Sequence, residues 1–311
     1  MITKIKTKTQ EEWLALRSKY IGGSDCASVV GLSPYRSAYT LWAEKLGKIP
    51  PFEGNLATEV GSFLEEFIAK KFEQETGKKV RKVNQSILNS DYPWAIANID
   101  RDIVGEDAGL EIKSTSELNM KSFKNGEYPA TYYCQCVHYL AVTGKKKWYL
   151  AVLIGNKEFK VFEIKRDEDE IAALMQAEKD FWDLVQKGES PVIDSLKSTS
   201  DTLTALYPTS NEDTVSLVTY EQELAEYSLL QAEIKRMEER KDEIANRIKN
   251  FLGESGRGEN DHYKVSWTTS SRNTFDVKAF AKDNPDIDLT NYYKTSTSRT
   301  FRISEKKEKK Q

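Results

Sequence analysis

The chain has 311 residues, enough for one large domain and a second unit. Charged residues make up 31% of it and the net charge is −3, so its surface as a whole is not that of a protein that coats nucleic acid, although a local basic groove is compatible with this balance. No apolar run approaches the roughly 18 residues of a membrane span, and the N-terminal MITKIKTKTQ is too polar for a signal peptide.

The cysteines and histidines argue against a structural metal centre. Cys26, Cys134 and Cys136 form no CxxC pair and leave one cysteine odd, and the sequence has two histidines, His138 and His262. This set is too sparse for a structural zinc site. We therefore expect a protein of a reducing cytoplasm.

The N-terminal segment predicts short helices separated by glycine turns. Thr9 and Glu12 form a capping-box pair that opens a helix through EEWLALRSK. The turn IGGSD leads into a second helix, CASVVG, and a third, AYTLWAEKLG, ends on a glycine.

The next helix, predicted at residues 55–76, carries an apolar arc and two adjacent glutamates. The arc consists of Val60, Phe63, Leu64, Phe67, Ile68 and Phe72. At about 100° per residue, Glu66 lies opposite the centre of this arc, whereas Glu65 lies nearer its edge. We therefore expect Glu65, rather than Glu66, to face the interior.

Strands and helices then follow up to about residue 186. Strands are predicted at 80–88, 93–103, 108–115, 147–154 and 157–166, and helices at 130–143 and 167–186. The order α-β-β-β-α-β-β-α predicts a single mixed α/β domain over residues 1–195.

The remainder predicts a linker and a smaller accessory region. Residues 196–219 are polar and rich in Ser, Thr and Pro, which is typical of a linker. Residues 220–311 begin with a long helix whose apolar residues recur at heptad spacing, broken by Lys241; it either docks on its own chain or binds a second copy or a partner. The strand-like segments HYKVSW and SRTFRIS and a short helix near 277–282 complete a small α+β module, whose basic character allows DNA-backbone contact.

The segment DAGLEIKSTS, residues 107–116, places an acid and a lysine two residues apart on an apolar strand. Residues i and i+2 of a strand share a face, so Glu111 and Lys113 point together while Ile112 points into the core. Asp100 ends the preceding predicted strand, and a glycine-containing turn between the strands would bring them side by side. Two carboxylates and an ammonium would then meet at one sheet edge.

Carboxylates held this close repel each other unless a cation shares the site. Mg²⁺ fits because it takes oxygen ligands and keeps several waters. The predicted ligands are Asp100, Glu111, the backbone carbonyl of Ile112 and, from the edge of its helix, Glu65. Lys113 would orient or help deprotonate a metal-bound water and stabilise charge on a phosphate, which is metal-assisted hydrolysis of a phosphodiester.

A Glu-x-Lys on an amphipathic strand is otherwise common as a cross-strand ion pair or a solvated face. Here the upstream Asp100, the order of the elements and Glu65 on a preceding helix favour a functional site. Further motifs accompany it: W-x-x-x-R at 13–17, IGGSDCASVVGLSPY at 21–35, VGSFLEEFIAKKFE at 60–73 and YYCQCVHYLAVTG at 132–144.

Together these motifs resemble the PD-(D/E)xK nuclease superfamily, and specifically the YqaJ-type viral recombinases related to phage lambda exonuclease. The resemblance implies an α/β fold with a restriction-endonuclease-like mixed β-sheet flanked by helices. In many members a proline precedes the metal-binding aspartate, whereas here Ile99 precedes Asp100. This difference affects the stiffness of the turn rather than the chemistry of the ligand.

The resemblance also implies residue roles. Asp100, Glu111 and Glu65 would bind metal, and Lys113 would be the catalytic lysine with Gln135 beside it. A second set of residues would bind the DNA end: Arg17 and Ser24 match positions that hold a terminal 5′-phosphate, and Tyr132, one helical turn before Gln135, would touch substrate phosphate. Alternatively, Ser24 is a helix cap, Arg17 a surface charge, and Tyr132 and Gln135 packing residues.

The function that the resemblance implies is a Mg²⁺-dependent 5′→3′ exonuclease, with Mn²⁺ as a possible substitute. It would act on double-stranded DNA ends and leave 3′ overhangs for a RecT-like single-strand annealing protein. A homo-oligomer, as a trimeric ring, and a phage or prophage origin in a bacterial cytoplasm are also implied. The alternatives are a structure-specific endonuclease of the same fold and a non-catalytic DNA-binding scaffold. Basic residues at 78–82 and 145–147 would line a duplex channel or be solvated surface.

Overall fold

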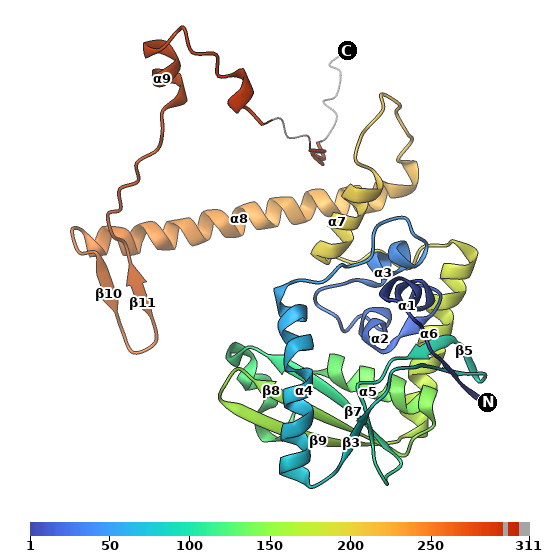
Figure 1. Cartoon of the computed structure of the whole chain (residues 1–311). Coiled ribbons are helices and arrows are strands. Elements are labelled where there is room, and N and C mark those ends of the chain that lie inside the picture. The colour runs from blue at the N-terminus through green and yellow to red at the C-terminus, as the bar shows by residue number, and fades with distance from the viewer. Residues whose placement is uncertain (295–297, 305–311) are drawn as a thin grey trace. The chain divides into compact units, whose positions relative to one another are not determined.

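The computed structural model describes residues 1–294 and 298–304. The chain forms two compact units, Met1–Tyr207 and Pro208–Gln311 (Figure 1). None of the helices within the described residues is both long and apolar enough to cross a membrane.

The first unit is organised around a mixed five-stranded sheet. Its strands, in spatial order, are β3 (Val80–Lys82), β6 (Arg101–Ile103), β7 (Ala108–Thr115), β8 (Lys147–Ile154) and β9 (Glu158–Lys165). Strands β7 and β8 are parallel over their whole length, whereas the other neighbours are antiparallel. The parallel pair requires a long connection, which contains a 3₁₀ segment, Glu117–Gly126, and helix α5 (Ala130–Thr143).

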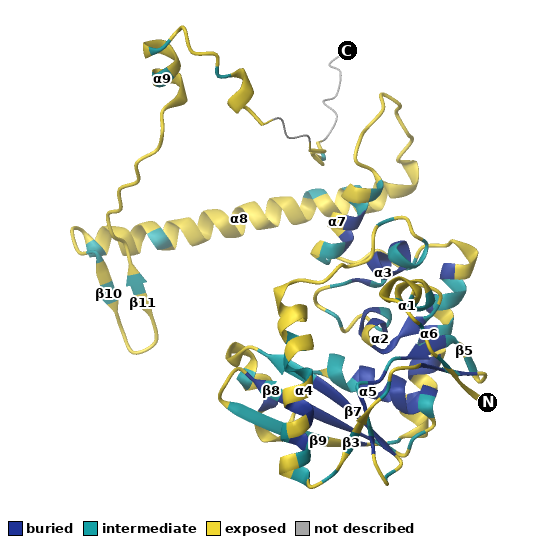
Figure 2. Cartoon of the chain, in the orientation of Figure 1, coloured by how far each residue is buried: buried dark blue, intermediate teal, exposed yellow. Residues whose placement is uncertain are grey.

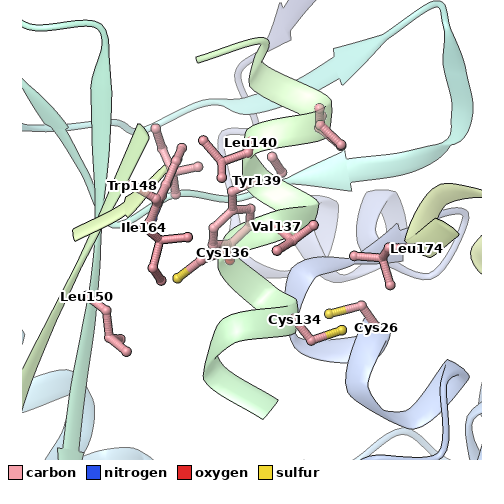
Figure 3. Close-up of a cluster of buried hydrophobic side chains, with 14 of the residues drawn as sticks. Cys26, Cys134, Cys136, Val137, Tyr139, Leu140, Trp148, Leu150, Ile164 and Leu174 are labelled. Carbon is pink, nitrogen blue, oxygen red and sulfur yellow. The ribbon is translucent and has the colours of Figure 1, made fainter. Parts of the chain in front are cut away.

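Two helices cover opposite faces of this sheet. The face toward α4 (Leu56–Thr76) buries Ile68, Ala69, Phe72, Ile103, Ala108, Leu110, Ile112, Tyr149 and Ala151. The opposite face buries Trp148, Leu150, Val152 and Ile154 of β8 against α5 (Figure 3). Alternate residues of β8 thus face different helices, as the two-residue period of a strand requires. The buried residues are concentrated in these layers (Figure 2).

The first unit contains a second sheet, whose strands alternate along the sequence with those of the first. It consists, in spatial order, of β1 (Ile2–Ile5), β4 (Ser86–Asn89), β5 (Tyr92–Ala97) and β2 (Ile21–Gly22). The predicted strand at 93–103 is therefore wrong as a single element, because β5 belongs to this sheet and β6 to the other. Asp100 lies in the short connection between them.

The remaining helices of the first unit lie around the second sheet. They are α1 (Gln10–Arg17), α2 (Gly23–Val29), α3 (Ala38–Lys45), α6 (Glu168–Lys187) and α7 (Lys197–Leu206). Helix α7 occupies part of the predicted linker, and its Thr202 hydroxyl hydrogen-bonds that of Thr40 on α3 at 2.9 Å. The chain therefore stays folded against the first unit up to about Tyr207.

The second unit contains the predicted long helix, α8 (Glu221–Leu252), and no residue of α8 is buried within the described chain. It also contains a short 3₁₀ turn (Val218–Tyr220), a hairpin of β10 (Arg257–Glu259) and β11 (Lys264–Ser266), helix α9 (Val277–Asp283) and a 3₁₀ turn (Thr290–Tyr292). The strand predicted at 298–304 does not form.

Only the C-terminal half of the predicted apolar arc of α4 is buried. Ile68 and Phe72 are buried, but Val60, Phe63 and Phe67 are 44%, 85% and 55% exposed. The reason is that the buried residues of this core belong to the C-terminal half of α4, where the helix crosses β7 and β8. Helical periodicity defines a face but not how much of it meets a partner.

Gly109 provides a test of the packing between β7 and β8. A Cβ atom at this position would lie 2.3 Å from the ring of Trp148, which is fully buried. We expect Gly109→Ala to lower the free energy of unfolding by roughly 1–3 kcal/mol, measured by urea denaturation, because the ring has to shift in a filled core. Gly61→Ala on α4 is the control, since its Cβ would be 3.6 Å from the nearest atom, Ser114 Oγ. Equal effects of the two changes would contradict this packing.

Candidate active site

Asp100, Glu111 and Lys113 lie together beside β7. The register of β6 and β7 pairs Arg101 with Leu110, so one step further along the antiparallel ladder Asp100 comes opposite Glu111. Asp100 Oδ2 accepts a hydrogen bond from the backbone N–H of Ile112 at 2.8 Å. Lys113 Nζ lies 2.6 Å from Glu111 Oε1, which confirms that these two side chains share a face.

The Glu111 carboxylate has one unsatisfied oxygen. Glu111 is 2% exposed, and its Oε2 atom has no hydrogen-bond partner within the part of the chain that the structure describes. A buried ionised oxygen without a donor is costly, because it has lost its hydration without compensation. A cation with oxygen ligands, placed between Glu111 and Asp100, would remove that cost. The donor set, two carboxylates and a strand carbonyl at Ile112, fits Mg²⁺ or Mn²⁺.

The electrostatics of the three groups agree with a site for a cation. Burial, and then the charge of Glu111, raise the pKa of Asp100 well above its ordinary value. Although burial opposes its charged form, Glu111 and Asp100 hold the pKa of Lys113 above its ordinary value. Lys113 is therefore a cation in this environment, which favours a role as a donor to phosphate over the predicted help in deprotonating water.

Glu65 occupies the predicted side of α4 but is already paired. Its side chain is 27% exposed against 66% for Glu66, as the helical geometry predicts. The Oε1 atom of Glu65 is hydrogen-bonded by Arg101 and lies 3.7 Å from Lys82 Nζ. Within residues 1–294 and 298–304, no three His, Cys, Asp or Glu side chains are grouped so as to hold a metal ion.

Arg101 is a site residue that the sequence did not single out. Its side chain is 3% exposed, and it donates to Glu65, to Glu66 Oε2 at 3.1 Å and to the backbone carbonyl of Asp100 at 2.8 Å. It thereby ties α4 to the connection that carries Asp100. Its position directly after Asp100 could have indicated a role in the site. The acids with which it pairs, however, are determined by the tertiary structure and not by the local sequence.

Helix α5 fixes the position of Lys113. Gln135 Oε1 accepts from Lys113 Nζ at 2.9 Å, and Gln135 Nε2 donates to the Tyr139 hydroxyl at 2.9 Å. That hydroxyl in turn donates to the carbonyl of Asn98 at 3.0 Å. Lys113 also lies over the ring of Tyr132, 5.4 Å from its centroid. The structure therefore brings both predicted α5 residues to the lysine.

Gly23 lets α2 approach this part of α5. A Cβ atom on Gly23 would lie 2.6 Å from the Tyr139 ring and 3.1 Å from Gln135 Cγ. The absence of a side chain at the first residue of α2 thus permits the contact between the two helices. Ser24, the next residue, is exposed, and its helix packs against the helix of Gln135, the partner of Lys113.

Arg17 and Ser24 are in direct contact, as their predicted shared role requires. Arg17 Nη2 donates to Ser24 Oγ at 2.6 Å, and the Arg17 guanidinium lies 5.3 Å from the Trp13 ring centroid. Ser24 is exposed at the start of α2, so it is not the helix cap, which is Gly22. An exposed hydroxyl and a guanidinium together suit an anion.

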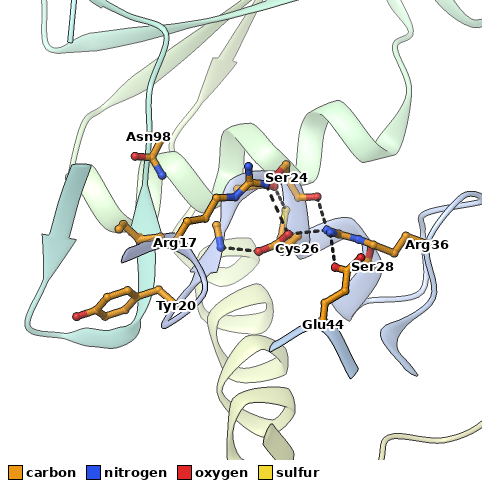
Figure 4. A network of polar contacts seen from close by, with 12 residues as sticks. Arg17, Tyr20, Ser24, Cys26, Ser28, Arg36, Glu44 and Asn98 are labelled. Carbon is orange, nitrogen blue, oxygen red and sulfur yellow. Dashed lines mark hydrogen bonds and ion pairs between the residues drawn. The ribbon is translucent and has the colours of Figure 1, made fainter. Parts of the chain in front are cut away.

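A buried carboxylate, Asp25, holds this corner together. Figure 4 shows the surrounding network of polar contacts, in which Arg17, Ser24 and Arg36 are labelled. Asp25 Oδ1 lies 2.5 Å from Arg36, and Oδ2 lies 2.8 Å from Lys45 Nζ and accepts from the backbone N–H of Gly22 at 3.1 Å. Although burial opposes ionisation, Lys45, Arg36 and Arg17 hold the pKa of Asp25 well below its ordinary value. Arg36 and Lys45 were not singled out from the sequence, because their distances from Asp25 along the chain conceal the contact.

The basic residues predicted to line a duplex channel are largely paired with acids. Lys78 and Lys147 both contact Glu106, Lys145 contacts Asp102 at 2.7 Å, and Arg81 contacts the same aspartate at 2.8 Å. Paired cations contribute less to an attractive field than isolated ones.

Residues 12–146 match the family model described as the YqaJ-like viral recombinase domain. The protein YqaJ of Bacillus subtilis (strain 168) is 35% identical over 293 residues, which cover 92% of this chain and 92% of that protein. The chain belongs to the YqaJ family. This finding confirms the predicted family.

A solved structure supports the fold of this YqaJ family member. An alkaline exonuclease from Laribacter hongkongensis, 21% identical, superposes with a TM-score of 0.50 over 58% of this chain and 94% of that one. A short segment also resembles the protein D345L of African swine fever virus (strain Badajoz 1971 Vero-adapted), which is 54% identical over 35 residues, 11% of this chain and 10% of that protein. The predicted α/β fold, a mixed sheet flanked by helices, is confirmed.

The raised pKa of Asp100 predicts how the stability of the metal-free protein changes with pH. An acid whose pKa is higher in the folded state binds more protons folded than unfolded, so stability falls as pH rises from the ordinary pKa through the folded one. We expect Asp100→Asn, which keeps an acceptor for Ile112 N–H, to gain melting temperature relative to the parent as pH increases, in EDTA. The control is Asp91→Asn, at an exposed carboxylate. A constant difference between parent and Asp100→Asn at all pH values would refute the shift.

Proposed function

We propose that this protein is a Mg²⁺-dependent 5′→3′ exonuclease that acts on double-stranded DNA ends and leaves 3′ overhangs. Membership of the YqaJ family and the fold shared with an alkaline exonuclease support nuclease chemistry. The observation that carries the proposal is the unsatisfied, buried Oε2 atom of Glu111, beside Asp100 and with Lys113 adjacent.

The proposed ligands of the metal are Asp100, Glu111 and the carbonyl of Ile112. Glu65, on the less exposed side of α4, is proposed as a further acidic ligand. When bound, a divalent cation supplies positive charge to a phosphate and makes water more acidic. Glu65 would need to exchange its contact with Arg101 for a direct one to become a ligand. Mn²⁺ has a similar preference for oxygen ligands and is expected to substitute.

Lys113 is proposed as the catalytic lysine. Its ammonium group donates hydrogen bonds and would stabilise the negative charge that grows on a phosphate oxygen during hydrolysis. Gln135 and the ring of Tyr132 restrict where this ammonium can move, so that it is oriented before substrate arrives. Such preorganisation lowers the cost of reaching the transition state.

Arg17 and Ser24 are proposed to hold the 5′-phosphate of the strand being cut. A terminal phosphate carries more charge than an internal one, and a guanidinium with a hydroxyl can recognise it by charge-assisted hydrogen bonds. Arg17 can bind a phosphate because it is not held in a short ion pair with Asp25. Arg36 and Lys45 neutralise the aspartate at short range, whereas Arg17 lies 3.9 Å from it. A pocket for a 5′ end sets the direction of digestion.

The resemblance to lambda-type exonucleases supports two further parts of the proposal. The protein would form a homo-oligomer, as a trimeric ring, and would hand its 3′ overhang to a RecT-like annealing protein. The second candidate function is a structure-specific endonuclease of the same fold, since the acid pair and lysine would serve either reaction.

Digestion of end-labelled DNA tests the direction of the proposed reaction. With Mg²⁺ and linear duplex, we expect early release of label from 5′ ends, retention of label at 3′ ends, no cutting of closed circles, and no reaction in EDTA. Lys113→Ala should lower the rate by 10²-fold or more, on the order of the loss of one preorganised donor. Cutting of closed circles would favour the endonuclease. An unchanged rate with Lys113→Ala would mean that the digestion does not come from this site, which would favour the non-catalytic scaffold.

A comparison of DNA ends tests the 5′-phosphate pocket. The parent protein should degrade 5′-phosphorylated duplex faster than 5′-hydroxyl duplex, because Arg17 and Ser24 bind the terminal charge. Arg17→Ala should remove this preference and change the rate on hydroxyl ends much less. Lys19→Ala, at an exposed residue of the same region, is the control. Persistence of the preference in Arg17→Ala would exclude this pocket.

A further inference from the structure

Two polar hollows of the first unit share a wall and form one groove. The first has a volume of about 530 Å³, reaches Asp100 and Glu65, and is also lined by Lys8 and Trp13. The second, of about 380 Å³, is lined by the N-terminal residues Lys4 and Lys6 and by residues 81–85. Residues 82–85, from the end of β3 to the start of β4, line both hollows. The groove therefore begins at the proposed metal ligands and leads to the N-terminal strand.

The cations of this groove differ in how they are paired. Five basic and three acidic side chains line the two hollows. Arg81 contacts Asp102, and Lys82 lies 3.7 Å from Glu65. By contrast, the exposed ammonium groups of Lys4, Lys6 and Lys8 have no acidic partner within residues 1–294 and 298–304. These three lysines are the uncompensated charge of the groove.

The three lysines are alternate residues of the sequence: Lys4 lies in β1, Lys6 follows it, and Lys8 lies in a bend before α1. Strand β1 pairs with β4, with Lys4 opposite Ile87 and Ile5 opposite Ser86, so the main chain of the segment is anchored on the second sheet. Lys4 and Lys6 line one hollow and Lys8 the other. The charges are thus distributed along the groove rather than gathered at one point. A ligand with regularly spaced negative charges matches this distribution.

The rest of the wall suits unpaired bases. It carries the amides of Asn84, Gln85 and Asn98 and the indole ring of Trp13, while the Ser86 hydroxyl and Trp13 Nε1 already donate to Asn98 Oδ1. Amides and hydroxyls offer both donors and acceptors, which base edges require, and an aromatic ring offers a stacking surface. A cationic groove with an aromatic side chain is the usual combination in proteins that bind single strands.

The volumes of the two hollows suit a single strand. Hollows of this size correspond to pockets for small ligands, roughly 300–1,000 Å³. A single strand, one or two nucleotides at a time, fits the space beside Asp100.

We propose that the groove between Lys4, Lys6, Lys8 and residues 82–85 binds an unpaired segment of a DNA strand, whose phosphates contact the three lysines and which leads to the acids at Asp100. This inference rests on the proposed function, since it names the part of the substrate that reaches the same acids. Lys4, Lys6 and Lys8 precede the region that matches the family model, which begins at residue 12.

The salt dependence of binding tests the groove without any hydrolysis. Fluorescence anisotropy in EDTA would measure the affinity for a fluorescein-labelled single strand, and for a blunt duplex of equal length, at several salt concentrations. For single strands, log Kobs falls with log[salt] by about 0.7 for each phosphate contact. The triple variant Lys4→Gln/Lys6→Gln/Lys8→Gln should therefore lose about 2 from the slope and bind single strand about 100-fold more weakly at 0.1 M salt.

Two further variants make the outcome specific. Lys48→Gln/Lys165→Gln/Lys187→Gln removes the same charge from exposed lysines outside both hollows, and should leave the slope within about 0.5 of the parent, less than one contact. Lys4→Arg/Lys6→Arg/Lys8→Arg should keep the parent slope. Thermal melting of the variants checks that each is folded.

The possible results separate the groove from the nuclease. A parent that digests DNA with Mg²⁺, but whose slope changes equally in the groove and control triples, would overturn the groove and leave the proposed function standing. A change of slope with the duplex but not with the single strand would also overturn it. A parent whose single-strand binding depends on the three lysines, but which hydrolyses no DNA, would support the groove and contradict the nuclease.

Discussion

The pair of half-buried Asp100 and buried Glu111 is the constraint on which the first unit depends. Bringing two carboxylates out of water costs several kcal/mol per ion unless opposite charge or hydrogen bonds compensate. Each compensating group comes from a different place: Lys113 from the same strand, the N–H of Ile112 from the backbone, and Gln135, which holds Lys113, from α5. The sheet register and the packing of α5 are therefore also the geometry of the site, and in the described chain one oxygen of Glu111 is left without a hydrogen-bond donor.

Local periodicity predicted the elements that carry the site. Which strands pair in a sheet, and which side chains meet across the fold, could not be predicted in this way. The two-residue period of β7 placed Glu111 and Lys113 on one face, and the predicted helix at 130–143 and strand at 147–154 agree with α5 and β8. The strand predicted at 93–103 failed because no local signal tells which sheet a segment joins. Arg101 was missed for a related reason: a buried arginine is identified by the acids it meets, and those lie on α4, some 35 residues earlier.

Asp25 and Asp100 show how one kind of residue acquires opposite properties. Both carboxylates are removed from water, which by itself raises the pKa of each. Asp25 has three cations around it and stays ionised, so it serves as a fixed anchor for the corner that carries Arg17 and Ser24. Asp100 has a second acid beside it and one lysine, so its ionised form needs a further positive charge. The first site is complete without a ligand, whereas the second is not.

The same distinction applies to the basic residues of the first unit. The runs at 78–82 and 145–147 attract attention in the sequence because they are dense, yet Glu106 and Asp102 neutralise most of them. The alternating lysines near the N-terminus are sparser but form no ion pair in the described chain, so their charge is less compensated. A net charge of −3 conceals this arrangement. What a DNA strand would meet is set by which charges the fold leaves uncompensated, and those lie at the two approaches to the acid pair: Arg17 beside Ser24, and the lysines of the groove.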